Sequence, residues 1–331
     1  MSDPTDTPSM EEIRPSYTDP SYGKPPEERT PEELLDSGFV PLDKPHGPTS
    51  HQVASWIKDI LGLDKAGHMG TLDPNTTGVL PVALGSSVKS LSVTLSEGKQ
   101  YIAVMEGHGT IDRTALDQLA SEFTGEIYQL VPVRSAVKRG LRTRRIHRLK
   151  VLEVEDREAL LMMDCESGTY VRTLIHDLGE VLGIGAHMSE LRRTRSGTVT
   201  IDQCVTLQEL TDAIYVYREK GDEKLIRKAI LPVEEMLSHL KRVIIKDSAV
   251  DAVCHGAPLG QPGIVSVHRH ISKDETVLLS TLKGEAVAIG KTLVSATEIM
   301  KRNSGVASNI ERVLMDPGTY PRAWKSRSHR Q

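Results

Sequence analysis

Near the middle of the chain a predicted strand leads directly into a predicted helix, and this restricts the fold more than any other part of the sequence. Residues 160–165 are rich in apolar side chains and are predicted to form the strand. After a turn at Ser167-Gly168-Thr169, apolar residues recur at the three-and-four spacing of a helix. A further strand is predicted at residues 101–105. The stripe that the helix is expected to bury consists of Val171, Leu174, Ile175, Leu178, Val181 and Leu182.

The chain is long enough for two folded units, because 331 residues exceed the size of a typical single domain. After about residue 240 the sequence changes to short strand candidates, such as residues 243–246, 277–280 and 286–289, separated by glycine and proline turns. This texture predicts a small β-barrel of about 80 residues. We therefore expect two folded units, of which the second is a β-barrel.

The first part of the chain has the composition of a disordered tail. Residues 1–38 hold ten carboxylates against three basic residues, a net charge of −7 compared with −4 for the whole chain. They also contain seven of the eighteen prolines and few apolar residues, so burial cannot offset the loss of chain entropy. The predicted organisation is a disordered acidic tail at 1–30, a first folded domain at 31–240, a β-barrel at 241–320 and a basic tail at 321–331.

The sequence gives no indication of a membrane segment or of a disulfide framework. No run of about 18 apolar residues occurs, and the N-terminus lacks the basic-then-apolar pattern of a secretory signal, so a cytoplasmic location is expected. The three cysteines, Cys165, Cys204 and Cys254, lie far apart and show no C-x-x-C spacing. Neither a disulfide framework nor a cysteine zinc site is predicted.

One loop places a single carboxylate among glycines. Residues 65–85 show no helical or alternating period at first, and Asp73 lies where no bulky side chain shields it. Arg172 stands in the first turn of the predicted buried helix, where it gains nothing from the helix dipole and should meet an anion instead. A carboxylate such as Asp73 would suit it, and a nearby cation favours the ionised form of a carboxylate. The alternative is that Asp73-Pro74 simply opens a turn.

A strongly basic stretch lies between the two predicted strands. Residues 134–150 contain no acid, whereas a solvated face normally mixes both signs. Such a density predicts a phosphate-binding loop or strand, and the alternative is a basic hairpin that meets only water. Arg192, Arg193 and Arg195 form a second cluster. The basic residues of the stretch are Arg134, Lys138, Arg139, Arg142, Arg144, Arg145, Arg148 and Lys150.

The motifs around these residues resemble those of the TruB-type pseudouridine synthases, in the same order along the chain. The resemblance covers roughly residues 33–325. It implies an α+β fold, in which a mixed-sheet pseudouridine synthase domain at 31–240 is followed by a small β-barrel PUA domain, a module that grips RNA. It points in particular to the archaeal branch that is similar to eukaryotic dyskerin, the catalytic subunit of box H/ACA ribonucleoproteins. The segments that carry it are Gly67-His68-Met69-Gly70-Thr71-Leu72-Asp73-Pro74, Lys99-Gln100-Tyr101, Gly168-Thr169-Tyr170-Val171-Arg172-Thr173-Leu174-Ile175, Gly185-Ala186-His187-Met188, Leu191-Arg192-Arg193-Thr194-Arg195-Ser196-Gly197 and, for the PUA domain, Met315-Asp316-Pro317-Gly318-Thr319-Tyr320-Pro321.

The resemblance implies roles for five side chains at the catalytic site. Asp73 would be the nucleophile and Arg172 its partner. Tyr101 would stack on the target base, and Leu191 would help to receive that base, which must leave its stack at a cost of a few kcal/mol. His68 would assist base flipping, while a loop-stabilising histidine remains an equal alternative. The chemistry breaks a C–N glycosidic bond and forms a C–C bond at the same sugar, so it needs no cofactor or metal.

Basic residues on several segments are expected to hold the RNA. The sequence departs from the family pattern at Met69, where relatives usually have a small residue, and at Gly107, where an apolar residue is common. Neither residue is one of the expected catalytic residues. The expected RNA contacts are Lys44, Lys65, Lys138, Arg139, Arg142, Arg144, Arg145, Arg192 and Arg193.

The function implied by the resemblance is that of a guided RNA-modifying enzyme. It would convert uridine to pseudouridine in ribosomal RNA with a box H/ACA guide RNA, and also modify the T-loop uridine (position 55) of transfer RNA. Three small partner proteins are implied: one zinc-ribbon-like, one of a Gly/Arg-rich family and one that binds kink-turns. The alternatives are a stand-alone transfer RNA synthase and an RNA-binding scaffold whose synthase motifs no longer act.

Overall fold

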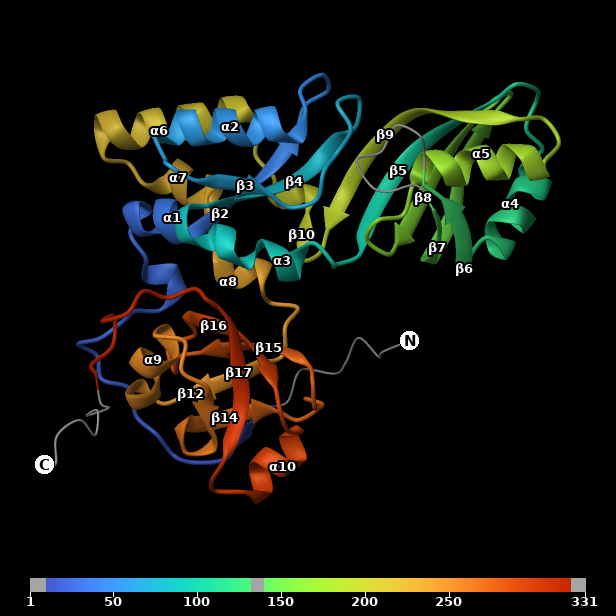
Figure 1. Cartoon of the computed structure of the whole chain (residues 1–331). Coiled ribbons are helices and arrows are strands. Elements are labelled where there is room, and N and C mark those ends of the chain that lie inside the picture. Colours follow the sequence, from blue (N-terminus) through green and yellow to red (C-terminus); the bar gives the residue numbers. More distant parts are fainter. Residues whose placement is uncertain (1–9, 132–139, 323–331) are drawn as a thin grey trace, which may run out of the picture. The chain divides into compact units, whose positions relative to one another are not determined.

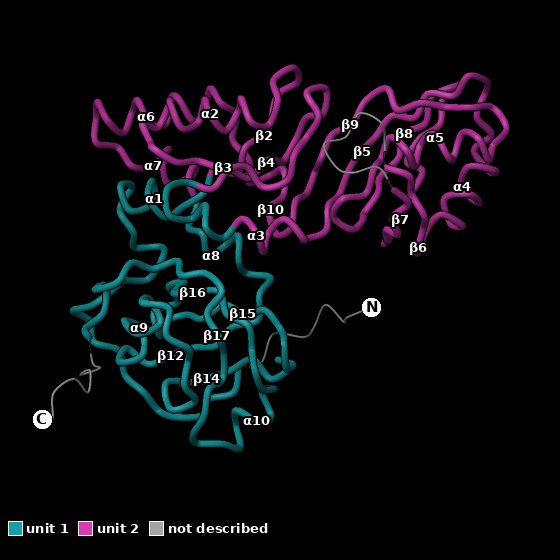
Figure 2. Tube along the Cα trace, viewed as in Figure 1, with its two compact units in different colours: residues 1–39, 84–90, 231–331 teal, residues 40–83, 91–230 magenta. Residues whose placement is uncertain are grey.

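The computed structural model describes residues 10–131 and 140–322, which divide into two compact units (Figures 1 and 2). The described part of the larger unit is 40–83, 91–131 and 140–230. That of the smaller unit is 10–39, 84–90 and 231–322. Within the described ranges, no helix is long and apolar enough to span a bilayer.

The larger unit is built on a mixed sheet. β4 and β9 run parallel, whereas β5, β6, β7, β8 and β9 pair antiparallel along the rest of the sheet. β3 (Ala66–His68) pairs with β4, and β10 (Val199–Thr200) pairs with β9. The strands follow one another across this sheet as β2 (Gly38–Lys44), β4 (Thr77–Leu84), β9 (Ala186–Ser196), β5 (Lys99–Gly107), β8 (Glu158–Cys165), β7 (Leu141–Glu155) and β6 (Gly125–Leu130).

Helices cover this sheet in two groups (Figure 1). α5 packs on β9 and β5 and α4 packs on β7, while α2 lies beside α6. α2 begins at a capping box formed by Thr49 and Gln52, and it ends at Gly62. The helical elements of this unit are α2 (Ser50–Leu61), α3 (Leu91–Thr94), α4 (Arg113–Glu122), α5 (Val171–Val181), the 3-10 turn η3 (Ile201–Gln203), α6 (Leu207–Lys220) and α7 (Lys224–Ala229).

The strand-to-helix passage predicted near the middle of the chain is β8 followed by α5. Val171, Leu174, Ile175 and Leu178 are buried as expected. The expected stripe was too long, because Val181, the last residue of α5, is exposed. The helix therefore buries its first two turns and releases its end, where Gly183 and Gly185 turn the chain into β9.

The smaller unit contains a second sheet with its own core. Val243, Ile245, Val277, Val287 and Ile299 belong to that core. The strands follow one another as β1 (Met10–Glu12), β14 (Ile264–His268), β12 (Arg242–Ile245), β15 (Thr276–Ser280), β16 (Ala286–Thr292), β17 (Val306–Val313) and β13 (Leu259–Gly260). The remaining elements are η1 (Pro26–Glu28), α1 (Pro31–Ser37), η2 (Gly85–Ser90), β11 (Leu231–Pro232), which pairs with residues 38–39 of β2, α8 (Val233–Met236), α9 (Asp247–Cys254), η4 (Gln261–Gly263) and α10 (Ala296–Lys301).

The predicted disorder of residues 1–30 is wrong for residues 10–30, and residues 1–9 lie outside the described ranges. β1 adds an antiparallel strand to β14, with Glu11 opposite Val267. Arg14 donates to the carbonyl oxygens of Gln261 and Ile264 at 3.0 and 3.3 Å. The segment is held by backbone pairing and polar contacts, which a prediction based on apolar composition does not count.

The predicted domain boundaries also change. Residues 31–39, 84–90 and 231–240 were assigned to the mixed-sheet domain, but they cluster with the smaller unit. That unit contains the described part of the predicted β-barrel, 241–320. Of the predicted basic tail, 321–331, only residues 321 and 322 are described. The α+β class, with mixed sheets and helices, is confirmed.

Candidate active site

The loop that carries Asp73 lies between β3 and β4 and is fixed at both of its sides. The Ser50 hydroxyl, at the start of α2, accepts a hydrogen bond from the Leu72 amide at 2.8 Å and donates one to the Leu72 carbonyl at 3.0 Å. On the other side of the loop, the backbone carbonyl oxygen of Asp73 accepts a hydrogen bond from the Thr76 amide at 3.0 Å. Asp73 therefore does open a turn, as the alternative reading of Asp73-Pro74 expected. A turn at this residue is compatible with a chemical role for its side chain.

Two buried cations support this loop from beneath. The Lys44 ammonium is fully buried and donates to the carbonyl oxygens of Pro45, Pro74 and Thr76 at 2.9 to 3.1 Å. Burial lowers the pKa of Lys44. Arg193 is also buried and donates to the carbonyl oxygens of Val79 and Gly70 at 2.7 and 3.0 Å.

These contacts assign Lys44 and Arg193 a structural role, and Arg193 also lines the cleft at Asp73. The RNA contacts expected of both residues stay predictions. Their donors serve backbone carbonyl oxygens, and the two residues are 0% and 1% exposed. Buried backbone carbonyls need such partners. Both residues hold the Asp73 loop in place.

Asp73 and Arg172 form an ion pair between Oδ2 and Nη2. This is the anion that the position of Arg172, in the first turn of α5, predicted. The two side chains are 58% and 50% exposed, so the pair faces solvent. A carboxylate held by one guanidinium and open on its other side has the geometry of a group that can react.

The pair lies in a cleft of about 530 Å³, within the range of small-ligand sites. Tyr101, Met188 and Leu191 also line it. Tyr101 points from β5 and is buried, which raises the pKa of its phenol, so the ring is neutral at physiological pH. The structure therefore brings four of the five predicted catalytic side chains to one cleft: Asp73, Tyr101, Arg172 and Leu191.

The fifth residue, His68, lies elsewhere. It is half-buried on β3, and its ring stands at right angles to that of His51 with the centroids 6.0 Å apart. Burial lowers the pKa of His68, and the neighbouring His51 lowers it further. His68 is not among the described residues that line the cleft, and neither is Lys65, which is exposed just before β3.

Lys99 is a cleft residue that sequence reasoning missed. Its side chain lines the cleft and is 4% exposed. Burial lowers the pKa of the ammonium to about 8, and Arg193 acts in the same direction. The signal was present in the sequence, because the alternation that places Tyr101, Ala103 and Met105 on one face of β5 also places Lys99 there.

The predicted RNA-binding residues are placed unevenly. Arg142, Arg144 and Arg145 lie on β7. The Arg144 guanidinium lies beside Gly168 of the cleft wall, 3.1 Å from where a Cβ would stand. Arg192 donates from Nη1 and Nη2 to the two carboxylate oxygens of Asp43 at 3.1 and 2.7 Å, so much of its charge is already neutralised. Lys138 and Arg139 lie outside the described ranges.

An α+β fold with a second, β-rich unit, and a solvent-facing carboxylate in a cleft of nucleotide size, are the features expected of an enzyme that acts on a nucleotide-sized substrate. The chain belongs to the TruB family of pseudouridylate synthases. The family model described as TruB family pseudouridylate synthase (N terminal domain) matches residues 58–113 and 106–171, and that of the tRNA pseudouridylate synthase B C-terminal domain matches 172–238. A PUA domain model matches 241–314, and a DKCLD (NUC011) domain model matches 8–54. The protein is an RNA pseudouridine synthase, an isomerase.

Similar proteins extend over almost the whole chain. A probable tRNA pseudouridine synthase B of Methanopyrus kandleri is 49% identical over 307 residues, which are 93% of this chain and 91% of that protein. A protein of the same description from Methanocaldococcus jannaschii is 51% identical over 304 residues, 92% of this chain and 90% of that one.

Two solved structures share the fold. A structure described as a Cbf5-Nop10-Gar1 complex matches with a TM-score of 0.91 and 46% identity, over 96% of this chain and 97% of that chain. A structure described as an H/ACA RNP bound to a substrate RNA containing 2'-deoxyuridine matches with a TM-score of 0.90 and 45% identity, again over 96% and 97%.

Proposed function

We propose that this protein is the catalytic subunit of a box H/ACA particle, in which a guide RNA selects uridines of ribosomal RNA for conversion to pseudouridine. The observation that carries the catalytic part is the Asp73–Arg172 pair, open to a cleft of nucleotide size. The guided part is supported by the likeness to chains of structures described as an H/ACA RNP and a Cbf5-Nop10-Gar1 complex.

Asp73 acts as the nucleophile in this proposal. Its carboxylate forms a transient bond to the nucleoside while the C–N glycosidic bond breaks, and the base then turns so that a ring carbon bonds to the same sugar carbon. The carboxylate is released, the ring carbon gives up a proton and the ring nitrogen gains one, so atoms and charge balance. Arg172 holds the carboxylate in position, since Nη2 contacts one of its two oxygens and leaves the other available.

Tyr101 and Leu191 hold the extruded base. A neutral aromatic ring and an apolar side chain give a detached uracil faces on which to stack. The two residues lie on neighbouring strands, because Tyr101 of β5 is opposite Arg193 and Leu191 is opposite Ala103. Arg142, Arg144 and Arg145 on β7 would contact the phosphates of the RNA strand that enters the cleft.

The proposal includes small protein partners: one zinc-ribbon-like, one of a Gly/Arg-rich family and one that binds kink-turns. The Cbf5-Nop10-Gar1 description names two proteins in complex with the similar chain and supports small partners here.

A second substrate, the T-loop uridine at position 55 of transfer RNA, is also proposed. It is favoured by the relatives described as probable tRNA pseudouridine synthase B. The enzyme would act on it without a guide RNA.

The substitution Asp73→Asn tests the catalytic assignment. The variant should bind substrate RNA nearly as well as the wild type and form no pseudouridine, because an amide is a poor nucleophile of the same shape. The matched control is Asp117→Asn, which changes an aspartate of similar exposure in the Arg113–Asp117 pair of α4 and should leave product formation unchanged. Equal product from Asp73→Asn and wild type would reject Asp73 as nucleophile.

A reconstitution separates the two substrates. Purified protein is incubated with a ribosomal RNA fragment, with and without guide RNA and partner proteins, and separately with transfer RNA. Product in the ribosomal fragment only when guide and partners are present supports the guided role. If pseudouridine forms in transfer RNA and never in the ribosomal fragment, the protein is a stand-alone transfer RNA synthase.

A further inference from the structure

The smaller unit contains a cavity of about 420 Å³ that shares no lining residue with the cleft at Asp73. We call it the acidic pocket. Six carboxylates and two cations are among the residues that line it. The carboxylates are Glu32, Glu33, Asp36, Glu234, Glu285 and Asp316, and the cations are Lys24 and Arg29.

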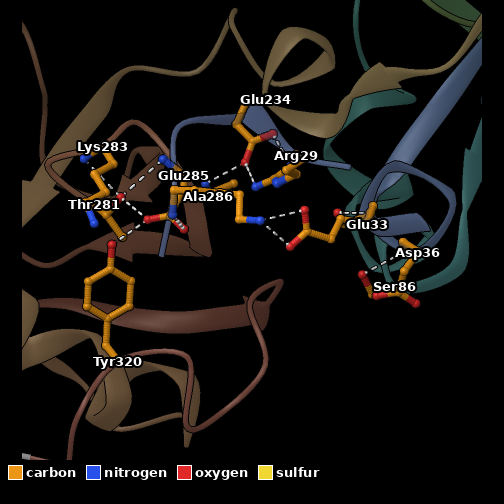
Figure 3. Close-up of polar contacts among 12 residues, drawn as sticks. Arg29, Glu33, Asp36, Ser86, Glu234, Thr281, Lys283, Glu285, Ala286 and Tyr320 are labelled. Atoms are coloured by element: carbon orange, nitrogen blue, oxygen red, sulfur yellow. Dashed lines mark hydrogen bonds and ion pairs between the residues drawn. The ribbon is translucent and has the colours of Figure 1, made fainter. Parts of the chain in front are cut away.

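Both cations of the acidic pocket are already paired (Figure 3). Arg29 donates to the two carboxylate oxygens of Glu234 at 2.8 and 2.7 Å, and Glu234 also accepts from the Ala286 amide at 2.8 Å. Lys24 donates to Glu33 at 3.0 Å. These contacts build one wall of the pocket and engage both of its cations.

A second buried carboxylate makes that wall rigid. Glu285 accepts hydrogen bonds from the Tyr320 hydroxyl at 2.5 Å, from the Thr281 hydroxyl at 2.7 Å and from the Lys24 amide at 3.0 Å. Gly23 has a φ of +60°, and a Cβ there would stand 2.4 Å from the Tyr320 oxygen, so only glycine fits. The chain around residue 23 is thus fixed against the pocket wall.

The open side of the acidic pocket carries exposed acids. Asp36, near the end of α1, and Asp316, after β17, are both exposed, and within the described ranges neither carboxylate takes part in an ion pair. Ser37 and Ser86 donate their hydroxyl protons to the carbonyl oxygens of Glu33 and Asp36 at 2.7 and 3.0 Å. Their oxygen atoms can still accept a hydrogen bond.

An independent observation at the same pocket concerns Ser87. Its side chain lines the pocket, is 2% exposed, and has no hydrogen-bond partner among the described residues. A buried hydroxyl without a partner is unfavourable by about 1–3 kcal/mol, and such a group in a native fold calls for an explanation. A donor that enters the pocket would satisfy it.

The chemistry of the acidic pocket fits an organic cation with an apolar stem. Its carboxylates are spread around the cavity, and no group of three or more potential metal ligands is close enough to hold an ion in the described part of the chain. Val233, Leu314 and Met315 supply apolar surface. A guanidinium spreads its charge over five N–H donors, and its alkyl stem packs on apolar side chains.

We propose that the acidic pocket binds an arginine side chain of a partner protein. The guanidinium would lie between Asp36 and Asp316 and donate toward the oxygen atoms of the serines. Its stem would lie along Leu314 and Met315. The proposal does not depend on the catalytic role of Asp73.

The test titrates the full chain with three probes: the peptide acetyl-Gly-Arg-Gly-amide, the same peptide with citrulline in place of arginine, and spermidine. Binding is followed by NMR chemical shifts and calorimetry. The arginine peptide should bind saturably and the neutral citrulline peptide at least tenfold more weakly. The double variant Asp36→Asn, Asp316→Asn should weaken the arginine peptide by about tenfold, and Ser87→Ala by several-fold. The matched control Glu311→Gln, which removes an exposed acid on β17 outside the pocket, should change nothing.

Each outcome of this test decides the proposal. Because Asp36 and Asp316 are exposed, their amide variants should keep the wild-type melting temperature, which is measured alongside. Absence of saturable binding by the arginine peptide, or equal binding by the double variant, overturns the proposal. Tighter binding of spermidine than of the arginine peptide would overturn the assignment to a protein side chain and identify a polyamine site.

Discussion

Each unit contains a carboxylate–guanidinium pair, and the two pairs differ in their exposure to solvent and in the number of hydrogen bonds that hold them. Asp73 and Arg172 are 58% and 50% exposed and meet through one oxygen and one nitrogen. Glu234 and Arg29 are 7% and 12% exposed and meet through two contacts, and Glu234 accepts a third hydrogen bond from Ala286. The first pair retains unused acceptor capacity at a cleft, and the second has almost none.

The difference separates reactivity from stability. An exposed ion pair contributes about 0–1 kcal/mol to stability, because water and salt screen it. A buried pair contributes little relative to apolar residues, but loss of one partner leaves an uncompensated charge and is strongly destabilising. We therefore expect substitutions at Arg29 to affect folding and substitutions at Arg172 to affect chemistry.

The largest effect is expected for Arg29→Met. It leaves the Glu234 carboxylate buried and unpaired, which should lower the free energy of unfolding by about 3–5 kcal/mol. Urea unfolding followed by circular dichroism measures this. The control is Arg113→Met, which breaks the exposed Arg113–Asp117 pair and should lower it by less than about 1 kcal/mol. Equal losses in both variants would contradict the comparison.

Lys99 lies between the two cases, since it is a buried cation that also lines the cleft. Its pKa is about 8 in the folded protein and 10.5 for an ordinary lysine. Below pH 8 both states are protonated, and the folded state carries the full penalty of the buried charge. Between pH 8 and 10.5 the unfolded chain retains the proton that the folded chain has lost, so this group makes stability rise with pH.

Lys99→Met should therefore be more stable than the wild type at pH 7, by up to about 3 kcal/mol at 1.36 kcal/mol per pKa unit. The advantage should disappear as the pH rises from 8 to 10.5. Urea unfolding at several pH values tests this, with exposed Lys65→Met as the control for loss of one charge. A stability difference that does not vary with pH would show that the ammonium titrates normally.

Arg172→Met is expected to change the free energy of unfolding little and to lower the reaction rate. Without the guanidinium, the Asp73 carboxylate is no longer held toward the substrate, and a misplacement of about 1 Å lowers the rate by about a hundredfold. Stability should change by less than about 1 kcal/mol. Single-turnover pseudouridine formation and urea unfolding are measured on the same preparation. A variant that loses stability and keeps its rate would reverse the assignment of the two pairs.

Local patterns in the sequence predicted much of the site. The alternation in β5 and the apolar period of α5 follow from residues a few positions apart, so they are visible without a structure. The pairing of Asp73 with Arg172 followed from the position of an arginine at a helix start. Tyr101 and Leu191 were placed by the family resemblance.

Several of the differences between expectation and structure have one physical cause. Lys44 and Arg193 were interpreted as RNA contacts because a sequence shows their charge and not the carbonyl groups beneath them. The acceptors of Arg193 are more than a hundred residues away along the chain. The pairing of residues 10–12 with β14 likewise joins segments more than 200 residues apart. Long-range polar contacts leave no periodic signal.

The triple variant, with glutamine in place of Arg142, Arg144 and Arg145, should weaken the salt dependence of RNA binding. All three lie on β7 of the larger unit. Each phosphate contact releases about 0.7 to 0.9 counterion, so the slope of log K against log salt should flatten by about 2 to 3. Filter binding from 50 to 300 mM salt measures it, and melting temperature serves as the folding control. An unchanged slope would exclude these arginines as phosphate contacts.

The smallest effect is expected for Arg192→Gln, and it tests whether charge alone decides RNA contact. Arg192 is partly exposed and was predicted to bind RNA together with the arginines of β7, but its guanidinium is held by both oxygens of Asp43. A cation that already has a fixed counter-charge releases no counterion when RNA arrives, so the salt slope should stay within about 0.3 of wild type, well below the 0.7 expected for one lost phosphate contact. Arg144→Gln, the single variant on β7, is the matched comparison and should lower the slope by the full contact. If both variants lower it equally, the Asp43 pair opens on binding, and the ion pairs of the unbound protein do not identify which of its arginines hold RNA.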